Sequence, residues 1–180
     1  MKSIVLAGGC FWGLQKFFDQ FAGLKTETGY ANGSSDKTDY RAVCAGSGHA
    51  EAVLVEYPKD LSLAQILAAY FAAVDPVSVN QQGNDVGINY RTGIYVQNEK
   101  DLQIARAMIV DLQKHFKAPV AIEVKYLENY CPAEDYHQKY LQKNPGGYCH
   151  LPRGLMSGHI LPTLQQTIEA YPSLKSILSE

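Results

Sequence analysis

The chain of 180 residues carries 16 lysine and arginine residues against 18 aspartate and glutamate residues, for a formal net charge of −2. Scattered basic residues and this charge argue against nucleic-acid binding, and a 46% hydrophobic content is that of a globular protein. The longest apolar run, Ile66 to Val74, is too short to cross a bilayer, and the first strand follows Met1-Lys2 directly. We therefore expect a cytoplasmic protein with no membrane partner.

The length predicts a single domain over residues 1–180, in which residues 155–180 form a C-terminal tail of no assigned role. The four cysteines, at positions 10, 44, 131 and 149, lie far apart and form no CxxC pair. This spacing argues against a zinc ribbon and against a small disulfide scaffold. No metal and no cofactor are expected, and any disulfide in a cytosolic chain would be transient and catalytic.

Strands and helices alternate in the first part of the chain. The expected elements are a strand at 3–7, a helix at 10–21, strands at 25–30 and 50–57, a helix starting at Ser62, and a strand at 92–97. A polar loop occupies 34–39, and Ser62 with Gln65 has the spacing of a capping box. The order β-α-β-β-α-β predicts a ferredoxin-like, two-layer sandwich of the α+β class.

The second part of the chain adds a helix and a strand and then becomes irregular. Asn98 caps a predicted helix that runs to His115, and an alternating strand follows Pro119 up to Tyr126. A short helix is expected at 133–142, a Pro- and Gly-containing loop at 144–149, and a terminal helix at 161–178, interrupted at Pro172.

The segment GGCFWG, residues 8–13, joins the first strand to the first helix. Cys10 is therefore expected at the first turn of that helix, where unpaired backbone N–H groups and the helix dipole favour an anion. The anion that a cysteine offers is the thiolate, which is its reactive form. A buried structural cysteine is the alternative, but two glycines before Cys10 and Phe11-Trp12 after it favour a reactive thiol.

Glu51 lies on the apolar face of the strand predicted at 50–57, together with Val53, Val55 and Tyr57. A carboxyl among apolar groups tends to keep its proton near neutral pH and can then act as a general acid. A surface glutamate with a salt-bridge partner is the alternative.

Further polar residues lie in loops or at their edges. Tyr40 follows the polar loop and Tyr90 precedes Arg91, positions from which a hydroxyl can point into a site. Asp85 lies in a turn-rich segment and His137 in the short helix at 133–142, where bonding to the local backbone or to solvent is the ordinary role.

Six sequence blocks follow one another between residues 3 and 150: GGCFWG, DYRAVC, SGHAEAV, GNDVGINYRTGIY, PAEDYHQKYL and NPGGYC. In order and spacing they resemble the peptide methionine sulfoxide reductase A family. The resemblance implies a ferredoxin-like α/β sandwich. It also implies thiol-dependent reduction of methionine-S-sulfoxide, free or in proteins, to methionine.

Carried over by position, the resemblance implies that Cys10 is the nucleophile and that Glu51 is the proton donor. Phe11 and Trp12 match the family's apolar pocket for the methyl group on sulfur. Attack on the sulfoxide leaves Cys10 as a sulfenic acid, which a second thiol can convert into a disulfide.

The remaining site residues follow from the later blocks. Tyr40 and Tyr90 match the hydroxyls that hold the sulfoxide oxygen, and Asp85 matches a supporting acidic residue. Cys149 matches the family's resolving cysteine. The implied partner is thioredoxin or a similar dithiol, which reduces the disulfide by exchange.

Two departures from the family leave alternatives open. Cys131 stands where relatives usually carry an aromatic residue, so it is either a competing resolving thiol or a small core residue. No cysteine follows Cys149, whereas some relatives carry one there. The alternative functions are a Cys-His hydrolase or acyltransferase, pairing Cys10 with His49 or His137, and a redox-sensing or partner-binding module without enzymatic activity.

Overall fold

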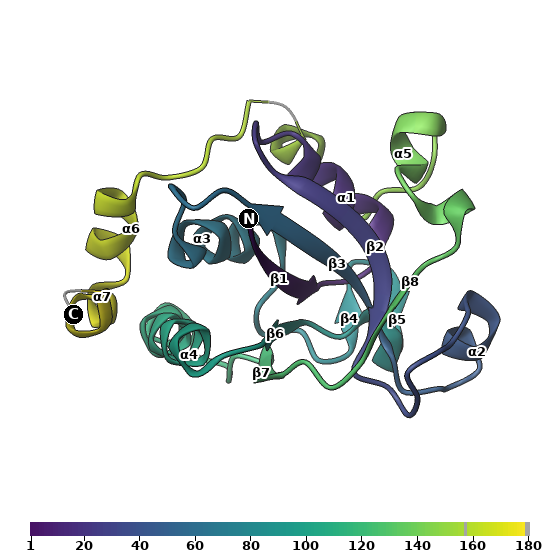
Figure 1. The fold of residues 1–180 in the computed structure, drawn as a ribbon, viewed down its shortest axis with the longest axis horizontal. Coiled ribbons are helices and arrows are strands. Elements are labelled where there is room, and N and C mark those ends of the chain that lie inside the picture. Colours follow the sequence, from purple (N-terminus) through teal and green to yellow (C-terminus); the bar gives the residue numbers. More distant parts are fainter. Residues whose placement is uncertain (157, 179–180) are drawn as a thin grey trace.

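A computed structural model describes residues 1–156 and 158–178, and its centre is a six-stranded sheet in the order β7-β6-β1-β3-β2-β8 (Figure 1). The strands are β1 (Lys2–Ala7), β2 (Lys25–Ala31), β3 (Ala50–Tyr57), β6 (Gly93–Val96), β7 (Glu123–Tyr126) and β8 (Tyr130–Pro132). The four central strands are antiparallel to one another, and β7 joins β6 in parallel. The predicted α+β class is confirmed, because these central strands have the β-α-β-β-α-β connectivity.

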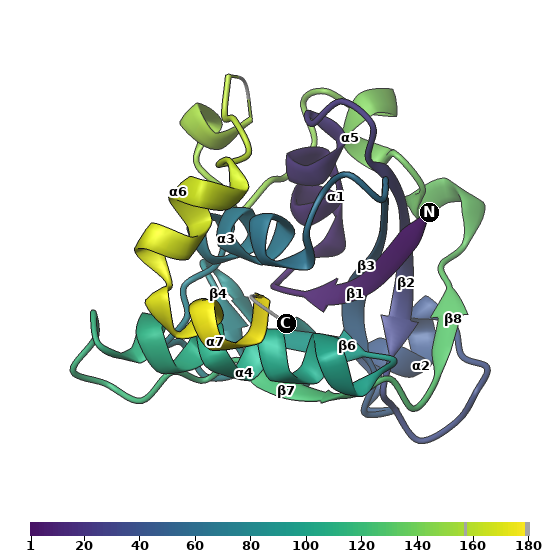
Figure 2. The ribbon, with the colours of Figure 1, turned by 60° about the vertical axis from the view of Figure 1, so that its left-hand side comes forward.

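Helices lie on one face of this sheet and around it. They are α1 (Phe11–Asp19), α2 (Tyr40–Cys44), α3 (Leu63–Ala73), α4 (Glu99–Gln113), α5 (Tyr140–Lys143), α6 (Leu164–Ala170) and α7 (Lys175–Leu178). In Figures 1 and 2, α1, α3 and α4 lie against the sheet, and α2 lies beyond its end. In the part of the chain that the structure describes, no helix is long and apolar enough to span a membrane.

Side chains along β3 alternate between the two faces of the sheet. Val53, Val55 and Tyr57 belong to the large core under the helices, whereas Ala50 and Ala52 belong to a smaller cluster on the opposite face. This is the predicted period of two. Glu51 shares the parity of Val53 and therefore points to the helix-covered face, where α1 begins.

The structure confirms Ser62 and Asn98 as the N-cap residues of two predicted helices. The Ser62 hydroxyl accepts from the Ala64 N–H, and the Gln65 side chain returns to the Ser62 N–H as a capping box. The Asn98 side chain accepts from the Asp101 N–H at the start of α4. These caps satisfy N–H groups that have no partner inside the helix.

The structure corrects several expected elements. The helix expected at 133–142 is wrong: a 3-10 turn, η2 (Asp135–His137), and α5 are separated by Lys139 at φ 55°. The Lys139 N–H donates to the Gln15 side chain of α1, so a tertiary contact replaces the helical bond. The strand expected from Pro119 is regular only over β7, because the Ala121 N–H instead bonds to the Pro76 carbonyl.

Three elements were not expected at all, namely α2, β8 and a small hairpin. The hairpin consists of β4 (Gln81–Gln82) and β5 (Asp85–Val86), and a 3-10 turn, η1 (Ile88–Tyr90), follows it. These elements have two to five residues each, too few to give a periodic pattern.

The C-terminal segment packs back onto the domain. The helix expected at 161–178 is interrupted at Pro172, as predicted, where a 3-10 turn, η4 (Pro172–Leu174), separates α6 from α7. Leu174 is fully buried, and the Ser173 N–H and hydroxyl both donate to the Asp111 carboxylate of α4. Figure 2 shows α6 and α7 lying across α3 and α4.

Candidate active site

Cys10 is the N-cap residue of α1, in an extended conformation between β1 and the helix. The preceding Gly9 has φ +79°, a conformation that L side chains rarely adopt, so the tight turn requires glycine there. The side chain of Cys10 is nearly covered, with 8% of the residue exposed. The predicted location of the thiol at a helix start is correct.

The protonation state of Cys10 differs from the expectation. Burial, followed by the nearby Glu51 and Asp85 carboxyls, raises the pKa of Cys10, against the N–H groups of Trp12 and Gly13, which lower it. The helix terminus therefore acts in the expected direction but is outweighed by the loss of solvent. The resting thiol is therefore protonated at neutral pH.

Glu51 is a buried carboxyl beside this thiol. It is 1% exposed; one oxygen accepts from the Phe11 N–H at 3.3 Å and the other from the Asn89 side-chain amide at 3.3 Å. Burial raises the pKa of Glu51 to about 8, although both hydrogen bonds lower it. No salt bridge of Glu51 is found within residues 1–156 and 158–178, so the surface-glutamate alternative does not apply.

A cavity of about 200 Å³ joins the thiol to the carboxyl. Its lining contains every predicted site residue except Cys149, together with one further tyrosine: Cys10, Phe11, Trp12, Tyr40, Glu51, Asp85, Tyr90 and Tyr148. The residues come from α1, α2, β3, β5, η1 and the loop after α5. The fold thus brings residues that lie far apart in the sequence together around this cavity.

One wall of the cavity is aromatic and rigidly held. The Trp12 ring stacks on Tyr140 with centroids 3.7 Å apart, and its indole N–H donates to Nδ1 of His137 at 3.0 Å. The His137 ring in turn contacts Phe11 and Tyr40, at centroid distances of 5.0 Å and 4.8 Å. Such a wall suits a small apolar group and excludes water from it.

Two tyrosine hydroxyls and the Asp85 carboxyl group also line the cavity. Burial raises the pKa of Tyr40 and of Tyr90 above the ordinary value, so both remain hydrogen-bond donors at physiological pH. Tyr40 is held at its backbone, where its N–H donates to Glu134 at 3.2 Å. One oxygen of Asp85 is buried without a hydrogen-bond partner among the described residues.

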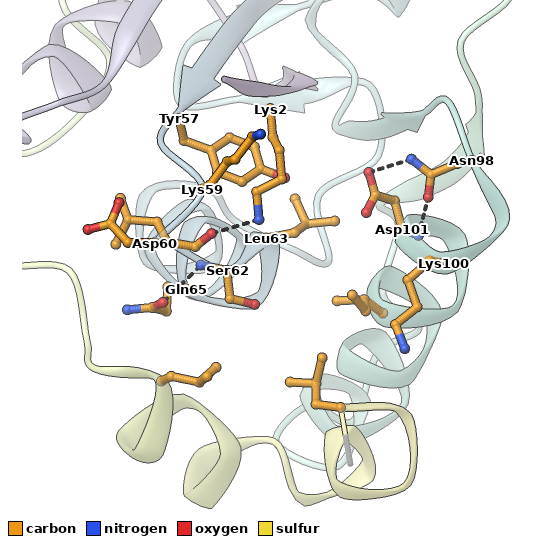
Figure 3. A pocket seen from close by; sticks show the side chains of 14 residues that line it. Lys2, Tyr57, Lys59, Asp60, Ser62, Leu63, Gln65, Asn98, Lys100 and Asp101 are labelled. Atoms are coloured by element: carbon orange, nitrogen blue, oxygen red, sulfur yellow. Dashed lines mark hydrogen bonds between the residues drawn. The ribbon is translucent and has the colours of Figure 1, made fainter. Parts of the chain in front are cut away.

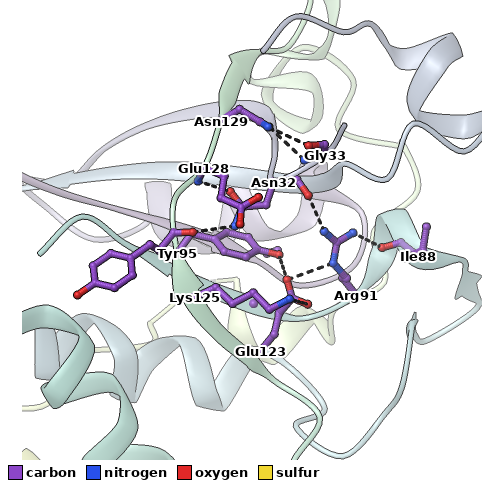
Figure 4. A network of polar contacts seen from close by, with 12 residues as sticks. Asn32, Gly33, Ile88, Arg91, Tyr95, Glu123, Lys125, Glu128 and Asn129 are labelled. Carbon is purple, nitrogen blue, oxygen red and sulfur yellow. Dashed lines mark hydrogen bonds and ion pairs between the residues drawn. The ribbon is translucent and has the colours of Figure 1, made fainter. Parts of the chain in front are cut away.

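Arg91 ties down the turn that carries Asn89 and Tyr90 (Figure 4). Its guanidinium donates to the Ile88 carbonyl at 2.8 Å, to the Asn32 carbonyl at 3.2 Å and to Glu123 at 3.3 Å. These bonds hold the turn η1 against β7 and against the residue that follows β2, and so help to position Asn89 and Tyr90.

An Arg91→Ala variant is expected to lose about 10-fold to 10²-fold in kcat, because a shift of about 1 Å in catalytic groups has this effect. Lys125→Ala is the matched control: Lys125 contacts the same Glu123 at 3.9 Å, is largely exposed, and does not reach η1. Steady-state kinetics and thermal unfolding of both variants give the comparison. Equal kcat values in the two variants would contradict this role.

Cys149 lies over the first turn of α1. A methyl group built on Gly13 would be 3.2 Å from the Cys149 sulfur, so this thiol occupies space that only glycine leaves free. Cys131 lies on β8, where its thiol donates to the Thr38 carbonyl at 3.5 Å. All four cysteines are free thiols in this structure.

The histidines named for a Cys-His hydrolase are not arranged as bases for Cys10. The two ring nitrogens of His49 are occupied by the Ser47 hydroxyl and the Ser35 carbonyl, both at 2.8 Å. Nδ1 of His137 accepts from Trp12, so its neutral ring carries the proton on Nε2 and offers no free lone pair.

A larger cavity, of about 430 Å³, lies beside β1, α3 and α4 (Figure 3). Lys2, Lys59 and Lys100 line it, but it contains no thiol. Lys2 donates to the Leu61 carbonyl and Lys100 to the Ile177 carbonyl. Two of its three lysines are thus already hydrogen-bonded to backbone carbonyls. The cavity at Cys10 is therefore the candidate active site.

Sequence reasoning missed two contributors to the site: Asn89, which holds Glu51, and Tyr148, which lines the cavity. It named His137 but did not predict that this residue fixes Trp12. Asn89 precedes Tyr90 and Tyr148 precedes Cys149, both of which the sequence analysis named. The contacts of Asn89 and Tyr148 with the site join distant parts of the chain, so no local sequence pattern predicts them.

Comparisons with known proteins identify the family to which the chain belongs. The family model described as peptide methionine sulfoxide reductase matches residues 2–166. The chain is 46% identical over 162 residues to the peptide methionine sulfoxide reductase MsrA of Clostridium acetobutylicum, covering 88% of this chain and 100% of that protein.

Solved structures agree. Mxr1 from Saccharomyces cerevisiae in reduced form superimposes with a TM-score of 0.78 at 32% identity, over 90% of this chain and 92% of that one. Mxr1 in complex with Trx2 superimposes with a TM-score of 0.55 at 22% identity, over 77% and 84% of the chains, a likeness of fold alone. The chain therefore belongs to the peptide methionine sulfoxide reductase A family and reduces methionine-S-sulfoxide to methionine.

Proposed function

We propose that Cys10 attacks the sulfur of methionine sulfoxide while Glu51 supplies the proton that the oxygen needs. The observation that carries this is the Glu51 carboxyl, buried, protonated below pH 8 or so, and bonded to the N–H of the residue next to Cys10. The oxygen passes from substrate sulfur to the Cys10 sulfur, methionine leaves, and the thiol proton restores Glu51. Thiol and sulfoxide thus become sulfenic acid and thioether, with atoms and electrons balanced.

The other lining residues bind the substrate. Phe11 and Trp12 receive the methyl group on sulfur, because they form the apolar wall next to the thiol. The Tyr40 and Tyr90 hydroxyls donate to the sulfoxide oxygen, where negative charge develops, and Asp85 supports them. The cavity takes the end of a side chain, so free methionine sulfoxide and exposed sulfoxides in proteins are both substrates.

Cys149 converts the sulfenic acid into a disulfide with Cys10, and a thioredoxin-type dithiol reduces that disulfide. Two observations support the choice of Cys149: its contact with Gly13 in the first turn of α1, and the location of Cys131 on an outer strand. The complex of yeast Mxr1 with Trx2 supports a thioredoxin as the reductant. Cys149 also lines a second cavity, of about 450 Å³, through which an external thiol can approach it.

A Cys149→Ser variant is expected to release one methionine per enzyme from the S-sulfoxide and then to stop when thioredoxin is the reductant. The sulfenic acid then has no internal thiol to attack it. Methionine release is measured by rapid quench, with the R-sulfoxide as a substrate that yields none.

Cys131→Ser is the matched control and is expected to cycle normally with thioredoxin. Peptide mapping after one equivalent of sulfoxide should find Cys10 joined to Cys149. If Cys131→Ser stops cycling and Cys149→Ser does not, Cys131 is the resolving thiol.

We also propose that residues 1–180 act as one catalytic domain and work in the cytoplasm. The burial of Leu174 and the bonds of Ser173 to Asp111 make the described C-terminal segment part of the same folded unit. Four free, widely separated cysteines suit a reducing compartment.

A further inference from the structure

His150, the residue after Cys149, lies against the start of α1. A methyl group built on Gly9 would be 2.8 Å from its Nε2, and one built on Gly13 would be 3.1 Å from its Nδ1. The same point on Gly13 is 3.2 Å from the Cys149 sulfur. The imidazole and the proposed resolving thiol therefore lie side by side over the turn that begins at Cys10.

The ring of His150 lies near the Gly8 backbone but makes no hydrogen bond of ordinary geometry to the described residues. Both ring nitrogens are buried, and neither has a hydrogen-bond partner within residues 1–156 and 158–178. Burial lowers the pKa of His150, against smaller opposite effects of Asp85 and of the Gly8 backbone. The ring is therefore neutral at physiological pH, with one nitrogen lone pair free.

The other buried histidines cannot offer the same group. His49 uses both nitrogens and His137 uses its lone pair to accept from Trp12, as described above. The titratable groups near His150 are Asp85 on β5, whose charge acts on the ring, and the Cys149 thiol, which lies beside it over Gly13.

The step that needs such a base is the formation of the disulfide. The bond between the two sulfurs forms, the S–O bond of the Cys10 sulfenic acid breaks, and the oxygen leaves as water. The Cys149 thiol has to lose its proton, and the departing oxygen has to gain one.

We propose that His150 accepts the proton of the Cys149 thiol as that sulfur attacks Cys10 and passes it to the departing oxygen. The proposal rests on the role of Cys149 given above. It assigns His150 to recycling and not to reduction of the sulfoxide, so the two steps can be measured separately.

The test is a single turnover with one equivalent of methionine-S-sulfoxide and no reductant. Methionine release is followed by rapid quench, and the sulfenic acid by trapping with dimedone. In His150→Gln, methionine release should keep its wild-type rate, while disulfide formation should slow about 10²-fold or more, the range for general base catalysis. His115→Gln, which removes an exposed histidine at the end of α4, should change neither step.

A second variant separates proton transfer from a purely structural role. In His150→Ala, added imidazole should restore disulfide formation in proportion to its neutral form. In the wild-type protein, disulfide formation should fall at acidic pH, with an inflection below the ordinary histidine pKa of about 6.5, and this inflection should be absent in His150→Gln. Failure of imidazole to restore the step, or an unchanged inflection in His150→Gln, would overturn the proposal.

Failure of the underlying assignment has a different signature. If Cys149→Ser still forms a disulfide from the sulfenic acid, the resolving role of Cys149 is wrong. If Cys149 is required and His150→Gln forms the disulfide at the wild-type rate, only the role of His150 is wrong.

Discussion

A Cys10→Ser variant is expected to form no methionine from methionine sulfoxide, with dithiothreitol or with thioredoxin. The hydroxyl that replaces the thiol cannot accept the sulfoxide oxygen, so the first step of the reaction does not occur. Because Cys10 is the thiol that lines the cavity with Glu51, no other cysteine substitutes for it. Methionine is quantified after single and multiple turnovers.

Cys44→Ser is the matched control for this experiment. Cys44 is exposed at the end of α2 and does not line the cavity. Serine keeps a hydrogen-bonding group beside Tyr40, so the variant should turn over at a near wild-type rate. Substantial methionine formation by Cys10→Ser would remove Cys10 from the role of nucleophile.

The second large effect is expected for Glu51→Gln, which should slow the reductase step about 10²-fold to 10⁴-fold. The amide keeps the shape of the side chain but has no proton to give. In the wild-type protein the pKa of Glu51 is about 8, so the rate should hold below that pH and fall about tenfold for each pH unit above it. The variant should lose this fall.

Glu56→Gln makes the same chemical change five residues along β3, on the opposite face of the strand. It should leave both the rate and the pH profile of the reductase step unaltered. Single-turnover kinetics between pH 6 and 10 or so, on variants whose circular dichroism matches the wild type, give the answer. A folded Glu51→Gln variant with a normal rate would reject the proton-donor role.

The parts of the site that the sequence predicted are those that a short-range pattern controls. Alternation along β3 put Glu51 on the same face as Val53, and the change from strand to helix put Cys10 at a helix start. Both predictions rest on the spacing of apolar residues within a single strand or helix. The six motif blocks then supplied the positions of Tyr40, Tyr90 and Asp85, which no period marks.

The remainder depends on contacts between distant parts of the chain. The amide of Asn89 reaches Glu51 only because η1 lies next to β3, and Cys149 reaches Gly13 only because the loop after α5 folds over α1. The prediction of an ionised thiol failed for a related reason. The helix terminus is local, whereas the burial that outweighs it comes from the whole cavity.

The buried carboxyl of Glu51 also has a thermodynamic consequence. An exposed glutamate in the unfolded chain loses its proton near pH 4.3, whereas Glu51 in the folded protein keeps its proton up to about pH 8. Folding therefore takes up a proton within this interval, and the free energy of unfolding falls as pH rises through it. The raised pKa that lets Glu51 donate a proton thus also makes the protein less stable at alkaline pH. Organisms that need sulfoxide repair under such conditions would have to recover that stability elsewhere in the fold.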